Sequence, residues 1–303
     1  MIRNRREPNC SFRIIRSSIQ VHGMKTDIEK KINYIVMDPT GNITALVTSC
    51  VEISRQPFIA GKIMEQHPEV EQVGFVDLSG TIDDPVQAKL RMAGGEFCGN
   101  ASMCTAVLFA ERNQIVSHAE IEIRLEVSGA EDIVSVRLSN DKNGLAEASV
   151  QMPKALSCQT EEFEYQELTA TLPLVQMQGI SHLIIEENSP FSFLKNEKKA
   201  AESAVRKWCG ELSAGGLGLM FFSGENSELM LTPFVYIPES GTVFWENSCG
   251  SGSSACGIYL AEKTKKDVSL AIRQPGGVLH VESAYGGNTV ISGTVRQLFH
   301  GFL

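Results

Sequence analysis

Two copies of one short motif, 151 residues apart, constrain the fold of this 303-residue chain more than any other feature. In each copy a Cys-Gly pair, Cys98-Gly99 or Cys249-Gly250, opens a segment with the pattern of a helix. With the two cysteines superposed, a Ser four residues on, apolar residues nine and eleven on, and an Ala-Glu pair at twelve and thirteen all coincide. Such internal self-similarity indicates two related structural units. We therefore expect two modules, each containing one of these helices.

The rest of the chain reads mainly as short strands with few helices. Helical patterns occupy residues 53–67, 99–113, 197–209 and 250–265. Strand patterns occupy residues 32–37, 44–47, 70–76, 119–127, 133–138 and 146–152, and further strands fall within 215–238 and 268–295. This pattern favours an α+β fold of two pseudo-symmetric β-rich modules, each wrapping a central helix, over a doubly wound βαβ sheet.

The expected domain organisation follows from these modules. Residues 28–149 together with the last strand, 290–303, form the N-terminal module, and residues 150–289 form the C-terminal module. Residues 1–27 are basic and are interpreted as a disordered tail or an over-long start, with a targeting tail as the other interpretation. The active site is expected in the cleft between the two modules.

Composition excludes several classes of function. The chain is 43% hydrophobic and 21% charged, with a net charge of −9, so a nucleic-acid partner is not expected because phosphate binding needs a basic surface. No apolar stretch reaches the ~18 residues of a membrane span. Eight cysteines without a CxxC pair indicate reduced thiols, and hence a cytoplasmic protein. A homodimer is the default expectation for the oligomeric state.

A cysteine at the start of a helix is suited to acid-base chemistry. The helix dipole and the free N–H groups favour the thiolate, so a lowered pKa is expected for Cys98 and Cys249. The same N–H groups can hold a carboxylate, and the small residues Gly99, Gly250 and Ser251 let an anion approach the backbone. If the two helix starts face each other, a substrate carbon between them can lose a proton from one face and gain another on the opposite face. Racemisation requires this geometry.

Several blocks of sequence resemble the diaminopimelate epimerase superfamily of cofactor-independent racemases and epimerases. The resemblance covers residues 30–303, and within the superfamily it is closest to the histidine racemases that supply D-histidine for staphylopine-type, opine-like metallophores. The matching blocks are Gly41-Asn42, Glu71-Gln72-Val73-Gly74-Phe75, Glu96-Phe97-Cys98-Gly99-Asn100-Ala101, Val150-Gln151-Met152-Pro153, the strand ending in His182, Tyr236-Ile237-Pro238-Glu239, Trp245-Glu246-Asn247-Ser248-Cys249-Gly250-Ser251-Gly252, Gln274-Pro275-Gly276-Gly277 and Ser292-Gly293-Thr294-Val295.

The resemblance implies a role for each matching residue. Cys98 and Cys249 would be the base and acid pair of an isomerase that needs neither pyridoxal phosphate nor a metal. Glu246 resembles the family glutamate near the second thiol, and His182 resembles a histidine near the first. Asn42, Gln72 and Asn100 resemble positions that contact the substrate amino acid. Glu71 is expected to accept a hydrogen bond from the imidazole N–H of histidine.

Departures from the family pattern leave alternatives open. Asn247 follows Glu246 where the diaminopimelate enzyme has Arg, which argues against diaminopimelate as the substrate. Another amino acid remains an alternative substrate. A second hypothesis is a hydrolase with Cys249, His182 and Glu246 as a triad, and a third is a non-catalytic amino-acid-binding or redox-sensing module. The spacings of Cys98 and Cys104 and of Cys249 and Cys256 match no usual zinc pattern.

Overall fold

The chain forms a long hydrogen-bonded sheet that winds around two of its helices. The computed structural model describes residues 31–115, 120–140, 144–224, 229–239 and 241–303. The strands are β1 (Asn33–Pro39), β2 (Thr44–Val47), β3 (Gln72–Asp77), β4 (Ala88–Met92), β5 (Ile121–Val127), β6 (Val134–Asn140), β7 (Ala146–Met152), β8 (Ser157–Tyr165), β9 (Leu168–Gln176), β10 (Ser181–Glu186), β11 (Leu217–Ser223), β12 (Leu229–Ile237), β13 (Thr242–Trp245), β14 (Val268–Gln274), β15 (Gly277–Ser283) and β16 (Thr289–Phe302). The helices are α1 (Gln56–Gln66), α2 (Gly99–Arg112), α3 (Lys198–Leu212) and α4 (Gly250–Thr264), with short 3-10 turns at Ile53–Arg55 and Ser192–Lys195.

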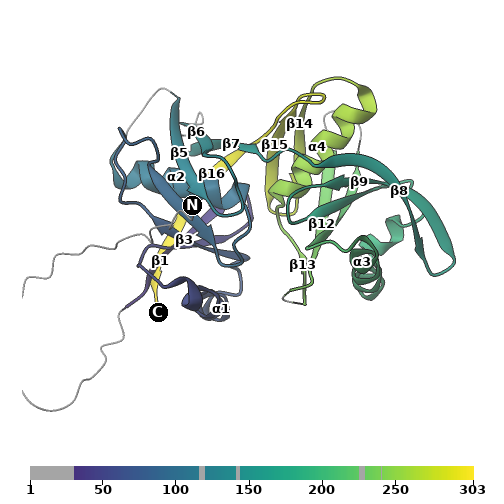
Figure 1. Cartoon of the computed structure of the whole chain (residues 1–303), viewed down its shortest axis with the longest axis horizontal. Coiled ribbons are helices and arrows are strands. Elements are labelled where there is room, and N and C mark those ends of the chain that lie inside the picture. The colour runs from purple at the N-terminus through teal and green to yellow at the C-terminus, as the bar shows by residue number, and fades with distance from the viewer. Residues whose placement is uncertain (1–30, 116–119, 141–143, 225–228, 240) are drawn as a thin grey trace, which may run out of the picture. The chain divides into compact units, whose positions relative to one another are not determined.

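Strands β1 to β7 and β16 form a closed ring around α2. They are hydrogen-bonded in sequence order, β16 follows β7, and β16 also pairs with β1, which closes the ring. Helix α2 contacts seven of these strands, and every residue from Gly99 to Ala110 is buried (Figure 1). A helix that is apolar on all sides needs such an enclosure, because none of its faces can remain in water.

The remaining strands continue the sheet beyond β16 and surround α4. Their order is β15-β14-β12-β11-β10-β9-β8, with β13 attached to β12. Helix α4 contacts β8 to β11, β14 and β15, and also β16 of the ring (Figure 1). Helix α3 packs on β11 and β12 with one face only, through Ala201, Ala204, Val205, Trp208 and Cys209. Helix α1 packs on β3 in the same one-sided way.

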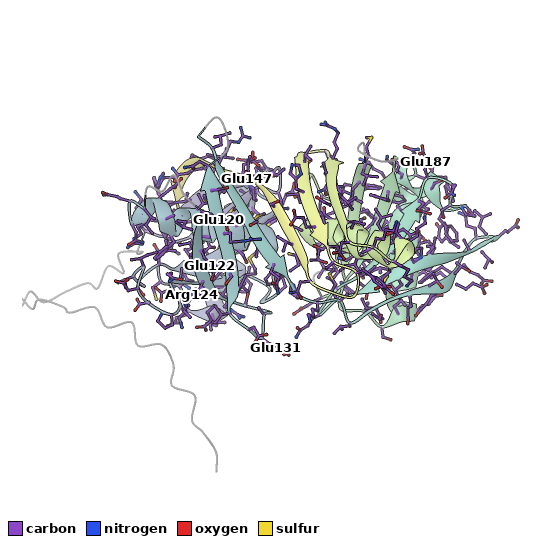
Figure 2. The ribbon with its side chains drawn as sticks, turned by 90° about the horizontal axis from the view of Figure 1, so that it is seen from above. Glu120, Glu122, Arg124, Glu131, Glu147 and Glu187 are labelled. Carbon is purple, nitrogen blue, oxygen red and sulfur yellow. The ribbon has the colours of Figure 1, made fainter. Side chains whose placement is uncertain are left out.

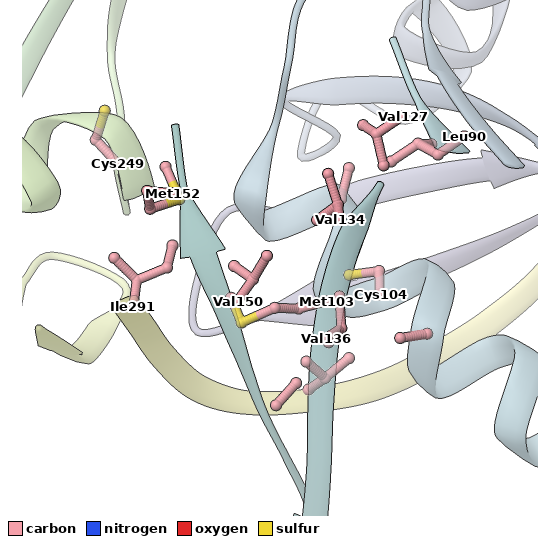
Figure 3. Packing of buried hydrophobic residues seen from close by; sticks show 14 of the residues in the cluster. Leu90, Met103, Cys104, Val127, Val134, Val136, Val150, Met152, Cys249 and Ile291 are labelled. Carbon is pink, nitrogen blue, oxygen red and sulfur yellow. The ribbon is translucent and has the colours of Figure 1, made fainter. Parts of the chain in front are cut away.

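The largest hydrophobic cluster joins the two groups of strands. It includes Met103 on α2, Met152 on β7, Ile291 on β16 and Cys249 before α4, several of which lie side by side in Figure 3. Along the strands, residues that face outward into solvent alternate with residues that face the buried interior. On β5, for example, Glu122 alternates with the buried Ile123 (Figure 2). Backbone contacts group residues 32–303 into one unit.

The sequence predictions of class and helices are confirmed, with corrections of detail. The structure is α+β, and the four predicted helices correspond to α1 to α4 within a few residues. The strands predicted at 32–37 and 44–47 are β1 and β2, which pair antiparallel. His182 does not end a strand but is the second residue of β10, and β4, β8, β9 and β13 were not anticipated. The predicted tail, 1–27, lies outside the described residues. In the part of the chain that is described, no helix is long and apolar enough to cross a membrane.

Candidate active site

The two cysteines of the repeat occupy the same structural position. Cys98 is the N-cap of α2 and Cys249 is the N-cap of α4, both with extended backbone. The Cys98 sulfur accepts the N–H of Ala101 at 3.4 Å, and the Cys249 sulfur accepts the N–H of Gly252 at 3.3 Å. The serine four residues after each cysteine donates to the cysteine's carbonyl, at 2.8 and 2.7 Å. The sequence repeat is therefore a repeated cap geometry, in which a sulfur takes the place of the usual capping oxygen.

Both helix starts lie against one side chain, Ile291 of β16. A Cβ atom added to Gly99 would lie 3.1 Å from Ile291 Cδ1 and 2.7 Å from the sulfur of Met152. A Cβ atom on Gly250 would lie 2.9 Å from the same Ile291 carbon and 3.4 Å from Asn100 Oδ1. A side chain at the first position of either helix would require the Met152 or Ile291 side chain to shift. Because they share this neighbour, the starts of α2 and α4 are held close to each other.

The pKa values of both thiols are raised, so the expectation of a lowered pKa is wrong. Burial raises the pKa of Cys98 to about 12, and the charges of Glu96 and Glu246 add to this effect. Burial also raises the pKa of Cys249 well above its ordinary value, and the neighbouring Glu246 acts in the same direction. The hydrogen bonds from Ala101 and Gly252 do lower the two pKa values, as the helix-start argument requires. Desolvation outweighs them because the thiolate is the charged form.

The immediate partner of Cys98 is an amide group. The Cys98 thiol donates to Gln72 Oε1 at 3.0 Å, and Gln72 Nε2 donates to the hydroxyl of Thr44 at 2.7 Å. Gln72 and Thr44 are register partners on the parallel strands β3 and β2. The predicted site residue Gln72 therefore lies at the first thiol.

The partners of Cys249 are a carboxyl, a hydroxyl and a second glutamine. Burial raises the pKa of Glu246 to about 7, and a side-chain hydrogen bond with Cys249 partly opposes this rise. The Ser251 hydroxyl lies 3.6 Å from the Cys249 sulfur. Gln274 Oε1 accepts the backbone N–H of Cys249 at 2.8 Å, while its Nε2 donates to Ser253 Oγ at 2.9 Å. Gln274 thus fixes the start of α4 from β14.

An amide and carboxylate network links residues from both ends of the sequence. Asn100 Nδ2 donates to Asn42 Oδ1 at 3.1 Å, and Asn42 Nδ2 donates to Glu71 Oε2 at 2.7 Å. The other Glu71 oxygen accepts from Asn247 Nδ2 at 2.5 Å. Burial raises the pKa of Glu71 even though Asn42 and Asn247 stabilise its charge. Asn100 is 2% exposed, and its Oδ1 has no hydrogen-bond partner among the described atoms.

Two glycine turns meet beside this network. Gly41, in the β1–β2 turn at φ +99°, has its Cα so near Gly276 that an added Cβ would lie 2.4 Å from Gly276 Cα. The Gly276 N–H donates to the Asn247 carbonyl at 2.7 Å. The close approach therefore holds the segment before Cys249 against the turn that carries Asn42.

His182 makes no hydrogen bond with either cysteine in the described structure. Its ring is fully buried in β10, and neither ring nitrogen has a hydrogen-bond partner among the described atoms, so it bonds to neither Cys98 nor Cys249. Burial lowers the pKa of His182 to about 4. Its register partner on β11 is Gly218, where an added Cβ would lie 2.5 Å from His182 Nδ1. The His182 side chain is therefore a neutral ring packed against Gly218.

Four residues of the site had no role in the sequence prediction. They are Thr44, Asn247, Ser248, whose buried hydroxyl is unpartnered in the described structure, and Gln274. Gln274 precedes a Pro-Gly-Gly turn, and Asn247 lies between Glu246 and Cys249. Both residues therefore belong to recognisable motifs, but nothing in the neighbouring sequence indicates which distant residues they bind. Among the described residues, no group of three His, Cys, Asp or Glu side chains is placed to hold a metal ion.

Comparison with solved structures places the fold in a class of racemases, epimerases and their relatives. A hydroxyproline epimerase from Agrobacterium vitis superposes with a TM-score of 0.65 at 12% identity, covering 91% of this chain and 93% of that one. A phenazine biosynthesis protein of the PhzF family from Bacillus anthracis superposes with a TM-score of 0.61 at 16% identity, covering 90% and 99%. At these identities the likeness establishes the fold.

Sequence comparison identifies the family. The family model described as the histidine racemase CntK N-terminal domain matches residues 31–298. A histidine racemase of Fusobacterium nucleatum is 35% identical over 254 residues, which cover 82% of this chain and 87% of that protein. A histidine racemase of Staphylococcus aureus is 28% identical over 278 residues, covering 89% and 96%. The chain belongs to the histidine racemase family and is thus an isomerase.

Proposed function

We propose that this protein interconverts L- and D-histidine by a two-base mechanism in which Cys98 and Cys249 act on opposite faces of the α-carbon, without an organic cofactor. The observation that carries the proposal is the pair of equivalent N-cap cysteines whose helices begin against the same Ile291 side chain. Delivery of D-histidine to an opine-type metallophore is part of the proposal and rests on the family resemblance.

The substrate carboxylate would be held by the free N–H groups at the starts of α2 and α4. These N–H groups and the helix dipoles would also stabilise the negative charge that develops when the α-proton leaves. The raised pKa values of the thiols fit this chemistry. An α-proton is a very weak acid, and a thiolate formed in a dry site is a stronger base than one in water.

Glu246 would take part in the proton balance at Cys249. With a pKa of about 7, the Glu246 carboxylate is a weaker base than the Cys249 thiolate, so it would hold the Cys249 proton only transiently and return it. His182 has no such contact with Cys98 in the substrate-free structure, so a direct role for it would need a rearrangement on binding. The same observation removes support from the Cys249-His182-Glu246 hydrolase hypothesis.

Recognition of the imidazole would fall to Glu71. Both of its oxygens already accept one hydrogen bond, from Asn42 and Asn247, but each retains a second lone pair for an imidazole N–H. Asn42 and Asn100 would then act mainly by holding Glu71 and the first helix start in place.

The proposal includes two modules with the substrate between them. Residues 28–149 plus 290–303 would form one module and residues 150–289 the other. The sheet supports this division in part, because β1 to β7 and β16 form the ring around α2, while α4 contacts β8 to β11, β14 and β15 and also β16. The Glu71–Asn247 bond and the Gly41–Gly276 approach cross the division.

The test is to incubate the reduced protein with L-histidine in D2O, without pyridoxal phosphate, and to follow optical rotation and the α-proton signal together. Loss of rotation with deuterium incorporation supports the proposal. Cys98→Ser and Cys249→Ser should each abolish racemisation, whereas the control Cys158→Ser, on β8 away from both helix starts, should keep it. Exchange of another amino acid in place of histidine would overturn only the substrate assignment. Full activity of either site variant would overturn the two-base mechanism.

A further inference from the structure

The site holds more carboxyl groups than cations. The Glu246 charge raises the pKa of both thiols, and the Glu71 charge raises the pKa of Glu246, so these groups are close neighbours. Glu96, in the loop before α2, adds to the effect on Cys98. In the described part of the chain, the one cation among the principal influences on these groups is Arg91, and it acts on Glu96. Glu71 and Glu246 therefore have no positive partner among the described residues.

The amide network of the site has a fixed direction, which is set by Glu71. Asn42 Nδ2 and Asn247 Nδ2 both donate to the Glu71 carboxylate, which can only accept. The oxygen of Asn42 is thereby turned to Asn100, whose Nδ2 donates to it. Asn100 is left with an unpartnered oxygen beside Gly250, although the residue is 2% exposed. Both ends of the network, Glu71 and Asn100 Oδ1, therefore offer acceptors to a ligand.

The spare hydrogen-bonding groups of this network favour a ligand with several N–H donors. A neutral imidazole has one N–H donor and one acceptor nitrogen, whereas an imidazolium has two N–H donors. The amides of Asn42 and Asn247 already donate to Glu71, and the free N–H groups at the helix starts are assigned to the substrate carboxylate. A neutral ring would thus bring a lone pair to a place where acceptors predominate.

We propose that the site binds histidine as the imidazolium cation, with one ring N–H donating to Glu71 and with Glu246 as the neighbouring countercharge. This inference rests on the proposed histidine racemase function and deepens it, because it names the charge state of the substrate. The charges of site and substrate balance only in this form. The helix starts take the α-carboxylate, Arg91 offsets Glu96, and the ammonium and imidazolium groups together offset Glu71 and Glu246.

The balance matters because the site is desolvated when the substrate fills it. A neutral ring would leave one carboxylate without a countercharge away from water, which is costly. A cation also opposes the effect of Glu246 on the Cys249 thiol, so it lowers the pKa of that thiol. Transfer of the Cys249 proton to Glu246 moves the negative charge onto sulfur and leaves the total charge unchanged. The substrate side chain would therefore help to form the thiolate that acts on it.

Most ionisable groups that neighbour this position are acids. They are Glu71 before β3, Glu96 before α2, Glu239 after β12, Glu246 before α4 and the two thiols. His182 on β10 is neutral because burial lowers its pKa to about 4, and Asp38 of the β1–β2 turn is already paired with Arg296. Glu246, with a pKa of about 7, ionises in the same range as an imidazole ring. The protonation state of the ring must therefore be read directly rather than from the pH dependence of binding.

The test uses NMR of histidine labelled with 15N in the ring, bound to the native, reduced, full-length protein between pH 5.5 and 9. A neutral ring has one N–H-type and one imine-type nitrogen, whereas an imidazolium has two N–H-type nitrogens. The pKa of the bound ring should lie at least about one unit above that of free histidine. Racemisation does not disturb the measurement, because both enantiomers carry the same label.

Glu71→Gln removes one negative charge with little change in size. The pKa of the bound ring should then fall by about one unit or more toward that of free histidine. Glu69→Gln is the matched control, since Glu69 is an exposed carboxylate two residues earlier that pairs with His67, and it should leave the ring pKa unchanged.

A second measurement needs no variant, so it stands even if Glu71→Gln does not fold. The 1,2,4-triazole analogue of histidine keeps a ring N–H but stays neutral near pH 7. In competition with labelled histidine at pH 6.5, it should bind the native protein at least about fivefold more weakly, as a ring pKa raised by one unit requires.

An imine-type nitrogen in the bound ring at pH 7, an unmoved ring pKa in Glu71→Gln, or equal binding of the triazole analogue would each overturn the inference. Absence of bound histidine would overturn it together with the substrate assignment. The NMR readout needs no turnover, so it is independent of the D2O experiment. Racemisation with a neutral bound ring would reject this inference alone. A bound imidazolium without α-proton exchange would reject the racemase proposal and keep the recognition of the cation.

Discussion

Replacing Glu246 by Gln should change how the stability of the protein depends on pH. Burial raises the pKa of Glu246 from 4.5 to about 7, so the folded state holds this proton more tightly than the unfolded state does. Below pH 4.5 the group costs nothing. As the pH rises from 4.5 to about 7 the folded protein loses stability, because the unfolded chain ionises in water while the buried group resists ionisation. At 1.36 kcal/mol per pH unit, the full cost is about 3 kcal/mol, of which some 2 to 3 kcal/mol develops between pH 5 and 8.

The measurement is urea unfolding of the native protein and Glu246→Gln at pH 5, 6, 7 and 8. The free energy of unfolding of the native protein should fall by about 2 to 3 kcal/mol relative to that of the variant across this range. A constant offset from the new amide does not matter, because only the pH dependence is compared. Glu187→Gln is the control, since Glu187 is an exposed carboxylate after β10 (Figure 2), and it should follow the native protein. Parallel curves for Glu246→Gln and the native protein would refute a buried, weakly acidic Glu246.

Three further predictions concern neighbouring parts of the site. Because burial lowers the pKa of His182 to about 4, the native protein should lose about 3 kcal/mol of stability as the pH falls from 6.5 to 4. The variant His182→Leu should not show this loss. Urea unfolding of both proteins across this pH range checks the prediction. Gln274→Ala should leave the Cys249 N–H and the Ser253 hydroxyl without this hydrogen-bond partner, which should lower the free energy of unfolding in urea by about 1–3 kcal/mol. It should also lower kcat more than it raises KM. An unchanged kcat would contradict a role of Gln274 in fixing the start of α4. Gly41→Ala should cost at least about 2 kcal/mol in thermal unfolding, since both its φ of +99° and the adjacent Gly276 backbone oppose a side chain, whereas Gly144→Ala, also at positive φ but in open space, should cost less.

Local chemistry explains what the sequence could predict. The N-cap positions of Cys98 and Cys249 follow from residues within four positions of each cysteine, because a helix start is specified by its cap and its first turn. The helix boundaries were accurate for the same reason. Strands β4, β8, β9 and β13 escaped prediction even though β4 alternates apolar and charged residues, because the place of each depends on pairing with strands elsewhere in the sheet.

The contacts of the site that could not be predicted from the sequence are those between residues far apart in the chain. Asn247 lies 176 residues from Glu71, and Gln274 lies 25 residues from the Cys249 N–H that it accepts. The thiol pKa values were predicted in the wrong direction because the helix-start effect is local, whereas the desolvation that outweighs it comes from the folded surroundings. The isolation of His182 likewise depends on the β10–β11 register that places it over Gly218.

The buried groups of this site lower stability on both sides of neutral pH. His182 destabilises the folded state as the pH falls below 6.5, because its buried ring resists protonation. Glu246 destabilises it as the pH rises through 7, because its buried carboxyl resists ionisation. Their costs have opposite pH dependence, similar size and overlapping ranges, so they largely cancel between pH 4.5 and 6.5, and the stability contributed by these two groups should be greatest near pH 5 to 6 by less than about 1 kcal/mol. The proposed proton acceptor for Cys249 ionises only above this range. The pH at which Glu246 becomes able to take the Cys249 proton is therefore the pH at which the site begins to lose stability. Glu246→Gln should separate stability from activity: at pH 8 the variant should be more stable relative to the native protein but should lose racemisation.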